Sequence, residues 1–256
     1  MREDDPAASS YWKRDQYFGD SRSSPSVLHS IGHWALQTPF RRIGRKYDGF
    51  KASLKLAQQV ASRQGRAFDL DILRHAITLS FLEHQKALSG RRVVVIGDGL
   101  GTMASLLLLN DPAVSVILVN LTDVLAIDLE YVARAVPANS DRVSPVEARH
   151  KEHLRDFEFD LAINIASMQE MTTAMIAGYF ELLREKNTLF YCCNREEKVL
   201  PDGQVIRFAN YPWRPDDKTF VDELCPWHQW CYTNRWPFYR RYEGPHRHRL
   251  ARLTVL

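Results

Sequence analysis

Three glycines at alternate positions, Gly97, Gly99 and Gly101, interrupt an apolar part of the sequence. Four β-branched residues, Val93–Ile96, precede them, and a leucine-rich stretch begins after Thr102. Glycine tolerates positive φ and lets a ligand contact the backbone, and the first turn of a helix offers unpaired N–H groups. The pattern therefore predicts a strand, a ligand-binding turn and a helix.

The spacing of these glycines favours one class of cofactor over another. Dinucleotide-binding turns have the pattern G-x-G-x-x-G, whose third glycine would fall at Thr102. The sequence has G-x-G-x-G instead, which is the spacing in enzymes that bind S-adenosylmethionine. We expect Gly97, Asp98, Gly99 and Gly101 to bind that cofactor.

A second group of residues has the types that bind metals. Cys225, His228 and Cys231 stand at even spacings of three. Structural zinc sites usually have four ligands in paired short spacings, so we expect no metal here and interpret the thiols as buried. The adjacent pair Cys192–Cys193 lies in an apolar run, where thiols act as small hydrophobes. Asp216–Asp217 alone are too few for a magnesium site.

The elements that must position these residues alternate along the chain. The predicted strands are Val93–Ile96, Val114–Val119, Leu161–Ile165 and Thr188–Cys193, and the predicted helices are Met103–Leu109, Val124–Ala135 and Thr172–Leu183. Alternation of this kind predicts an α/β fold in which helices cover both faces of a parallel sheet. Ligands bind beyond the C-terminal ends of such strands.

The N-terminal part of the chain has a different character. Residues 1–45 mix charges, serines and aromatics without a sustained period, which predicts an irregular arm with one short helix. Residues 46–88 have a helical pattern, with apolar positions that fall mostly on one face: Ile72, Leu73, Ala76, Ile77, Phe81 and Leu88. We therefore divide the chain into an arm with a helical extension, 1–88, and a second domain, 89–256.

The composition excludes several classes of function. The chain has 256 residues, 45% of them hydrophobic, and a net charge of +3. That charge is too small to indicate a nucleic-acid partner. No run of 18 apolar residues predicts a membrane span. The polar, acidic N-terminus is unlike a secretory signal peptide, and the cysteines form no disulfide framework, so we expect a cytoplasmic protein.

From Arg91 onward the sequence resembles class I S-adenosylmethionine-dependent methyltransferases. It resembles more narrowly the bacterial sugar O-methyltransferases found with surface-polysaccharide genes. The segments that carry the narrower resemblance are FDLAINIASMQEM (159–171), YFELLR, a strand that ends in Asn194 and Arg195, FANYPW (208–213) and GPHRHRLARL. The resemblance implies a Rossmann-like, seven-stranded, mostly parallel sheet whose last strand is antiparallel, and HRLARLTVL fits that strand.

The cofactor-binding residues implied by the resemblance differ from the broad pattern in two places. Val95 stands where class I enzymes commonly have an acidic residue, and Asn120 stands where an acidic residue binds both ribose hydroxyls. An amide lacks the charge-assisted strength of a carboxylate. Asp123 is an alternative ribose ligand, or else an N-cap of the next helix. Asn164 completes the expected cofactor contacts.

Two residues are candidates for the general base that removes a proton from the acceptor. Glu170 follows the fourth strand, whose end faces the reacting methyl group in this fold. Its alternative role is to cap the helix that begins near Thr172, since an acidic group stabilises a helix N-terminus. His228 is the second candidate, because an unperturbed imidazole titrates near neutrality, and the alternative is a packed core histidine.

The acceptor is expected to contact polar and aromatic residues. Four of the six tryptophans lie between Phe208 and Tyr242, and flat rings with a polar edge suit sugars, although such rings also fill cores. Arginines in the same region could bind phosphate. The residues expected to bind the acceptor are Ser167, Gln169, Asn194, Arg195, Tyr211 and Trp213.

The sequence therefore predicts an O-methyltransferase that acts on a sugar hydroxyl of a nucleotide sugar or a surface glycan. Two alternatives stay open: a non-catalytic methyltransferase-like module in a glycan-assembly complex, and a natural-product O-methyltransferase. The expected partner is the sugar acceptor. A second copy of the chain and a glycan-assembly enzyme are further options.

Overall fold

The N-terminal part of the chain is helical. The computed structural model describes residues 27–89, 92–232, 236–242 and 244–255. Four helices precede the sheet: α2 (Val27–Leu36), α3 (Thr38–Gly44), α4 (Phe50–Arg63) and α5 (Leu70–His84). Residues 27–44 thus hold two helices where the sequence predicted one, because Pro39 in the first turn of α3 separates the two runs. The rest of the predicted arm, 1–26, lies outside the described residues.

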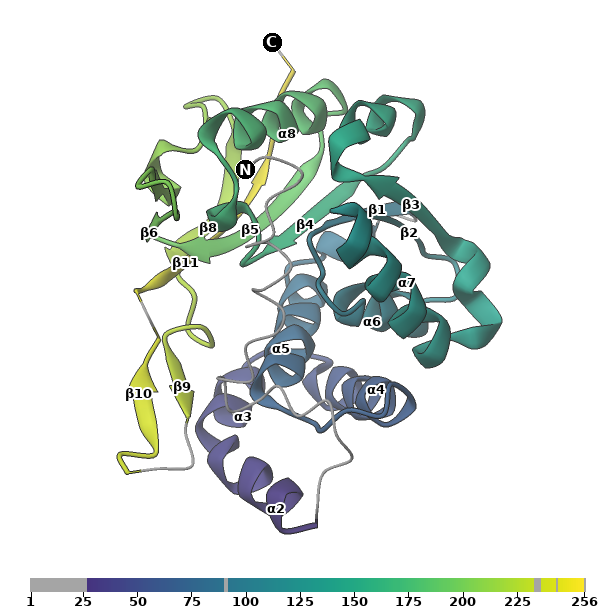
Figure 1. Ribbon diagram of the computed structural model, residues 1–256, viewed down its shortest axis with the longest axis vertical. Coiled ribbons are helices and arrows are strands. Elements are labelled where there is room, and N and C mark those ends of the chain that lie inside the picture. Colours follow the sequence, from purple (N-terminus) through teal and green to yellow (C-terminus); the bar gives the residue numbers. More distant parts are fainter. Residues whose placement is uncertain (1–26, 90–91, 233–235, 243, 256) are drawn as a thin grey trace.

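A seven-stranded sheet forms the centre of the fold (Figure 1). Its strands are β1 (Arg92–Ile96), β2 (Ser115–Asn120), β3 (Val143–Glu147), β4 (Leu161–Ile165), β5 (Leu189–Arg195), β8 (Lys218–Leu224) and β11 (His246–Arg252). Their order is β3-β2-β1-β4-β5-β11-β8. The first five are parallel, and β11 is antiparallel to both of its neighbours. This confirms the predicted sheet with an antiparallel last strand.

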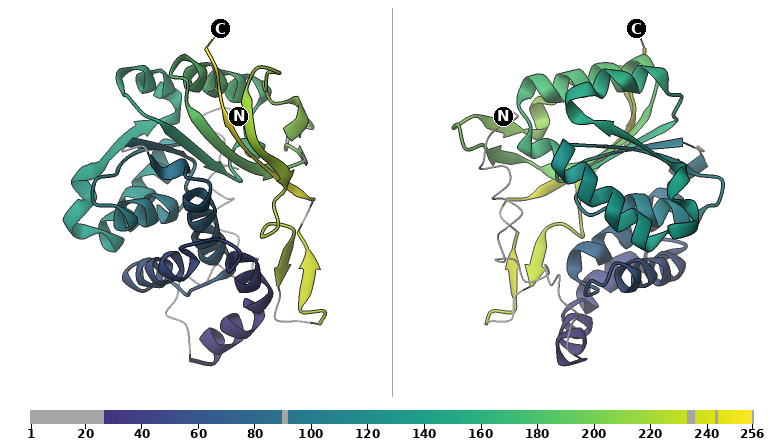
Figure 2. Two further views of the ribbon diagram at one scale, coloured as in Figure 1. Left: turned by 180° about the vertical axis from the view of Figure 1, so that it is seen from behind. Right: turned by 45° about the vertical axis from the view of Figure 1, so that its right-hand side comes forward.

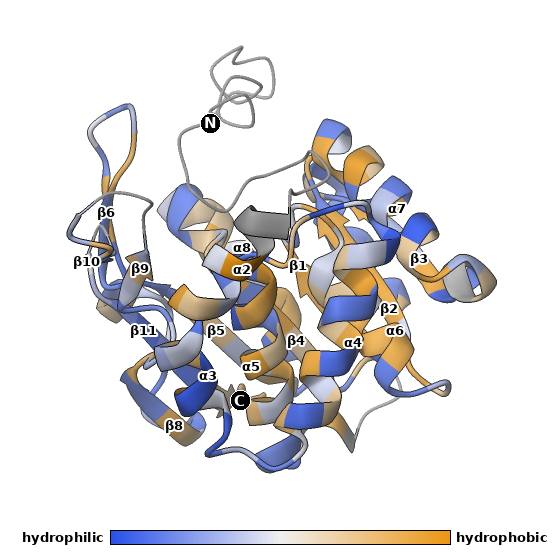
Figure 3. Ribbon diagram, turned by 90° about the horizontal axis from the view of Figure 1, so that it is seen from below, coloured by the Kyte–Doolittle hydropathy of each residue, from blue (hydrophilic) through white to orange (hydrophobic). Residues whose placement is uncertain are grey.

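Helices cover both faces of the sheet (Figure 2). Val93 and Val95 point into the core shared with α4, α5 and α6 (Thr102–Asn110), whereas Val94 and Ile96 point toward α8 (Thr173–Glu185). Helix α7 (Thr122–Ala135) follows β2. The short 3-10 helices are η1 (Ala87–Ser89), η2 (Pro137–Arg142), η3 (Ala148–Asp156), η4 (Met168–Glu170) and η5 (Phe208–Asn210). In Figure 3, β1 and α6 are mostly hydrophobic and β11 is largely hydrophilic.

Helix α5 is buried on every side, although the sequence predicted a single apolar face. Every residue from Ile72 to Leu82 is buried, Arg74 and His75 included. The sheet covers one side of the helix, and the turn after β8 covers another, where Trp227 Nε1 donates to Thr78 Oγ1 at 3.1 Å. Leu88 belongs to η1 rather than to α5. The predicted extension thus shares one core with the sheet.

Two small hairpins lie outside the main sheet. Strands β6 (Glu197–Val199) and β7 (Val205–Arg207) pair with each other, and so do β9 (Trp230–Tyr232) and β10 (Tyr239–Arg241). The β9–β10 hairpin lies beside α2 and α3 (Figure 1), and Tyr239 Oη donates to the Leu36 carbonyl at 3.0 Å. Among the described residues, no helix combines the length and apolar character that a membrane crossing requires.

Candidate functional site

The glycine turn joins β1 to α6, as the sequence predicted. Gly97, Gly99 and Gly101 have φ values of 73°, 83° and 58°. A Cβ atom at Gly97 would collide with the side chain of Ser167, and one at Gly101 would lie 2.5 Å from Val132 Cγ2. At these two positions glycine is required by packing within the chain as well as by backbone conformation.

Aspartate side chains of the protein itself accept hydrogen bonds from the backbone N–H groups at the start of α6. Asp98 accepts hydrogen bonds from the N–H groups of Met103 at 2.9 Å and Ala104 at 2.8 Å. The Gly101 N–H donates to Asp128 Oδ1 at 3.1 Å. Burial raises the pKa of Asp98, and the neighbouring His75 acts in the opposite direction. The helix N-terminus is thus neutralised from within the protein.

Asn120 ends β2 beside the turn, where the sequence predicted it, but its side chain already has two partners. Its Nδ2 donates to Asp128 Oδ2 at 2.8 Å, and its Oδ1 accepts from the Leu121 N–H at 2.9 Å. Asp123 is exposed in the first turn of α7. The alternative prediction, that Asp123 is the N-cap of this helix, is wrong because Leu121 occupies that position.

Asp128 is the residue of this site that sequence reasoning missed. It is fully buried, and burial together with the charge of Asp98 raises its pKa to about 7. It shares the buried face of α7 with Val124, Leu125 and Val132. A lone acidic residue on an apolar helix face was the signal that could have found it.

The turn also has partners on the N-terminal helices. The Gln64 amide Nε2 donates to the Leu100 carbonyl at 3.2 Å, and Arg66 Nη1 donates to Thr102 Oγ1 at 3.1 Å. Both donors lie between α4 and α5, and both are buried. The connection between these two helices therefore supports the glycine turn from the side of the N-terminal helices.

Four of the predicted site residues bind one another beyond the ends of β4 and β5. Asn164 Nδ2 donates to the Ile96 carbonyl at 2.9 Å, and Asn164 Oδ1 accepts from Asn194 Nδ2 at 2.7 Å. Ser167 Oγ donates to the same Ile96 carbonyl at 3.0 Å. Asn194 Oδ1 accepts from the Gln169 N–H at 3.1 Å. This network fixes the loop after β4 against β1 and β5.

Glu170 lies at the end of that loop, on the surface. Its side chain is 36% exposed, and one carboxylate oxygen lies 3.1 Å from Lys198 Nζ. Thr172, rather than Glu170, caps α8, because its Oγ1 accepts from the Met175 N–H. The apolar surroundings expected for Glu170 are therefore replaced by an ion pair.

Arg195 ends β5, and its side chain shares the Tyr242 ring with Arg74 of α5. The Arg195 N–H donates to Gln169 Oε1 at 2.8 Å, and its guanidinium lies 5.3 Å from the centre of the Tyr242 ring. Lys198 follows in β6. Glu170, Lys198 and Arg195, with the Tyr242 ring, form a polar rim beyond the ends of β4 and β5.

Tyr211 and Trp213 lie on the α8-facing side of the sheet, where the charge of Glu170 acts on Tyr211. Tyr211 is buried with Phe208 and Phe180 under α8, and the Trp213 ring centre lies 4.7 Å from that of Phe180. His228 is buried on the opposite, α5-facing side of the sheet, where burial and the charge of Arg74 lower its pKa. A buried imidazole with a lowered pKa is a weak base, so the structure does not favour His228 as the general base.

The sequence matches no protein-family model and no curated protein. Among solved structures, a Thermoplasma acidophilum protein has a TM-score of 0.53 at 14% identity, over 80% of this chain and 98% of its own. A candidate RNA methyltransferase of Pyrococcus horikoshii has a TM-score of 0.49 at 12% identity, over 72% and 85% of the two chains. The TrmK protein of M. capricolum, bound to S-adenosyl-homocysteine, has 0.44 at 8% identity, over 63% and 62%.

The strand order, the antiparallel β11 and the first of these likenesses define the fold. It is a Rossmann-like α/β fold with a mostly parallel seven-stranded sheet and an antiparallel last strand. Identities this low establish the fold alone, so activity has to be argued from the residues of the site.

Proposed function

We propose that the chain is an S-adenosylmethionine-dependent O-methyltransferase that acts on a sugar hydroxyl. The observation that carries the proposal is the occupied N-terminus of α6. Asp98 accepts from Met103 and Ala104, and Asp128 accepts from Gly101. A dinucleotide places its pyrophosphate on these N–H groups, and here two carboxylates hold them.

The hydrogen-bonding groups of the turn support the same choice of cofactor. A pyrophosphate needs donors, and the donors at the start of α6 already face carboxyl oxygens, whereas a ligand with an ammonium group needs acceptors of the kind that Asp98 and Asp128 offer. The half-buried backbone from Gly97 to Leu100 is accessible to such a ligand. These residues fit S-adenosylmethionine on the chemistry of the donors and acceptors that they offer.

The ribose side of the site is built from Asn120 and its exposed neighbours. Because Asn120 Nδ2 donates to Asp128, the amide is held with Oδ1 as its acceptor, and a carbonyl oxygen has two lone pairs of which Leu121 N–H uses one. The exposed Asp123 follows three residues later. We propose that these two side chains receive the ribose hydroxyls.

The polar rim provides the groups that the acceptor needs. When bound, the cofactor supplies an electrophilic methyl group on sulfur. Glu170 then accepts the proton of the acceptor hydroxyl as that oxygen takes the methyl group. Correct alignment supplies about 7–11 kcal/mol of barrier reduction, and a general base about 10²–10⁴-fold in rate. Lys198 and Arg195 offer cations to a phosphorylated sugar.

Isothermal titration calorimetry tests the cofactor assignment directly. We expect one S-adenosylhomocysteine molecule to bind per chain and NAD⁺ to give no measurable heat of binding. Binding of NAD⁺ with no binding of S-adenosylhomocysteine would refute the proposal. A methyl-transfer screen over nucleotide sugars and polysaccharide fragments, with small phenolic acceptors as the contrast, then tests the acceptor class. Cofactor binding without transfer to any of these acceptors would favour the non-catalytic module.

A further inference from the structure

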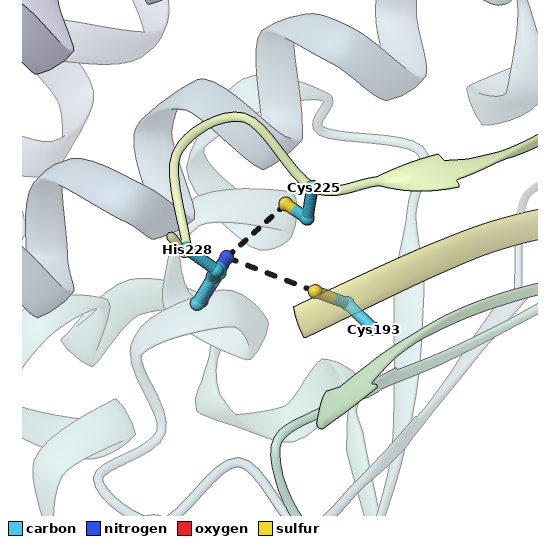
Figure 4. A group of neighbouring side chains, drawn as sticks. All are labelled: Cys193, Cys225 and His228. Carbon is cyan, nitrogen blue, oxygen red and sulfur yellow. Dashed lines mark hydrogen bonds between the residues drawn. The ribbon is translucent and has the colours of Figure 1, made fainter. Parts of the chain in front are cut away.

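Two buried thiols and one buried imidazole meet on the α5-facing side of the sheet (Figure 4). Cys193 comes from β5, and Cys225 and His228 come from the turn after β8. His228 Nδ1 lies 3.3 Å from Cys225 Sγ and 3.7 Å from Cys193 Sγ, and the three atoms all lie within 4.8 Å of one another. The cluster therefore joins two segments that are 32 residues apart in the sequence.

Hydrogen bonds between these three side chains cannot satisfy all of their polar atoms. Nδ1 of an imidazole is either one donor or one acceptor, in the plane of the ring, and here two sulfur atoms compete for it. Thiols are weak hydrogen-bond partners in any case. A metal ion placed between the three atoms would satisfy both sulfurs and the nitrogen at once.

The distances have the values expected for a tetrahedral zinc site. With Zn–S of about 2.3 Å and Zn–N of about 2.0–2.1 Å, the S···N edge of a tetrahedron is about 3.6 Å. The two observed S···N distances, 3.3 and 3.7 Å, bracket that value. From this geometry we propose that Cys193, Cys225 and His228 bind a zinc-like divalent cation.

A fourth ligand is also near. The ring of His246, in β11, stacks on that of His228 with centroids 5.4 Å apart. His246 is fully buried, and among the described residues no side chain forms a hydrogen bond with either of its ring nitrogens. His246 is therefore the nearest candidate in the described part of the chain for a fourth ligand, and three protein ligands with one other group also satisfy a zinc ion.

Without a metal ion the cluster is uncharged, because burial raises the pKa of Cys225 and lowers that of His228. Burial lowers the pKa of His228, which keeps its imidazole in the neutral form that binds metals. Binding converts two thiols and a divalent cation into a neutral dithiolate complex and releases two protons, so no buried net charge is created. The cation would tie β5 to the turn that carries Trp227, which packs on α5.

Metal analysis of the full chain tests the proposal. After purification and removal of loosely bound ions, elemental analysis should find one zinc ion per chain, and the zinc-edge X-ray absorption spectrum should show two sulfur ligands. Cobalt substitution should produce a thiolate-to-cobalt charge-transfer band. Cys225→Ser should lose both signals. Cys231→Ser is the matched control and should keep them, since Cys231 is half-buried and lies outside the cluster.

A measurement on the unaltered chain covers the case in which Cys225→Ser fails to fold. Stripping the metal with a chelator should lower Tm by about 5–10 °C, and zinc should restore it, as expected for a ligand present at about 100 times its dissociation constant. A metal-free chain whose Tm is indifferent to added zinc would overturn the proposal. Equal loss of zinc in Cys231→Ser and Cys225→Ser would overturn it as well.

Discussion

Replacement of Asp128 by Asn measures what the buried carboxylate next to the glycine turn contributes to stability. The amide has nearly the same shape and keeps an oxygen that can accept from the Gly101 N–H. It cannot ionise, and it places an NH₂ group opposite the Nδ2 donor of Asn120. Asp128→Asn therefore removes a buried charge and one hydrogen bond, and these two changes act on stability in opposite directions.

The magnitude of each change follows from the structure. The pKa of Asp128 rises from 3.8 to about 7 on folding, with burial as the main cause. Stability from this group is therefore fully present below about pH 4 and is lost as the pH rises through 7. The difference between the two pKa values corresponds to about 4 kcal/mol. The lost hydrogen bond costs about 1–3 kcal/mol at any pH.

The two effects predict a change of sign with pH. At pH 3.5, below the pKa of the carboxyl group in the unfolded chain, we expect Asp128→Asn to unfold more easily than the parent chain by about 1–3 kcal/mol. At pH 8 it should be more stable by about 1–3 kcal/mol, which raises Tm by roughly 2–10 °C. Thermal and urea unfolding at both pH values measure this. Glu130→Gln, on the exposed face of α7, is the control and should show no reversal. Equal destabilisation at pH 3.5 and pH 8 would refute the buried-charge argument.

Three further substitutions test the site. Asn120→Asp places a second carboxylate opposite that of Asp128, so we expect weaker binding of S-adenosylhomocysteine and a lower Tm at pH 8. The sequence alone predicts the opposite, tighter binding, because a carboxylate is the stronger ligand for ribose hydroxyls. Calorimetry with S-adenosylhomocysteine decides between the two. Gly99→Val should abolish cofactor binding and leave the circular dichroism spectrum unchanged. The control Gly203→Val, at a similar φ of 86° in an open turn, should bind the cofactor normally. Wild-type affinity in Gly99→Val would show that the glycine turn does not bind the cofactor. Glu170→Gln should lower kcat by about 100-fold or more and leave the cofactor affinity unchanged. The control Glu197→Gln, which breaks the ion pair with Arg207, should leave kcat unchanged. If Glu170→Gln lowers only the Tm, the carboxylate of Glu170 has a structural role.

The strands that the sequence predicted are the ones with continuous apolar character. Leu161–Ile165 was predicted with the bounds that β4 has, because both of its faces are buried. The strands β3 and β8 were missed because they lie at the two edges of the sheet, where β3 is mostly half-buried and β8 is mostly exposed. Edge strands lack the apolar run that marks a central strand of a parallel sheet.

The candidate site was predictable where it depends on local sequence. The glycine turn follows from the order strand, glycines, helix. The pairing of Asn120 with Asp128 depends on how α7 returns to β2, and the meeting of Cys193 with Cys225 depends on the register of β5, β11 and β8. Spacing along the chain therefore suggested Cys231 as the third member of the sulfur cluster, and the sheet places Cys193 there instead.

The hydrogen bonds from Gln64 and Arg66 to the glycine turn bear on how the chain can be divided. A fragment that begins at β1 would lack both donors, and it would also expose to water the side of the sheet that α5 covers. We therefore expect amide exchange in α5 and β1 to slow together during folding, and proteolysis between α4 and α5 to release bound cofactor. The segment between α4 and α5 would in this sense be part of the proposed cofactor site.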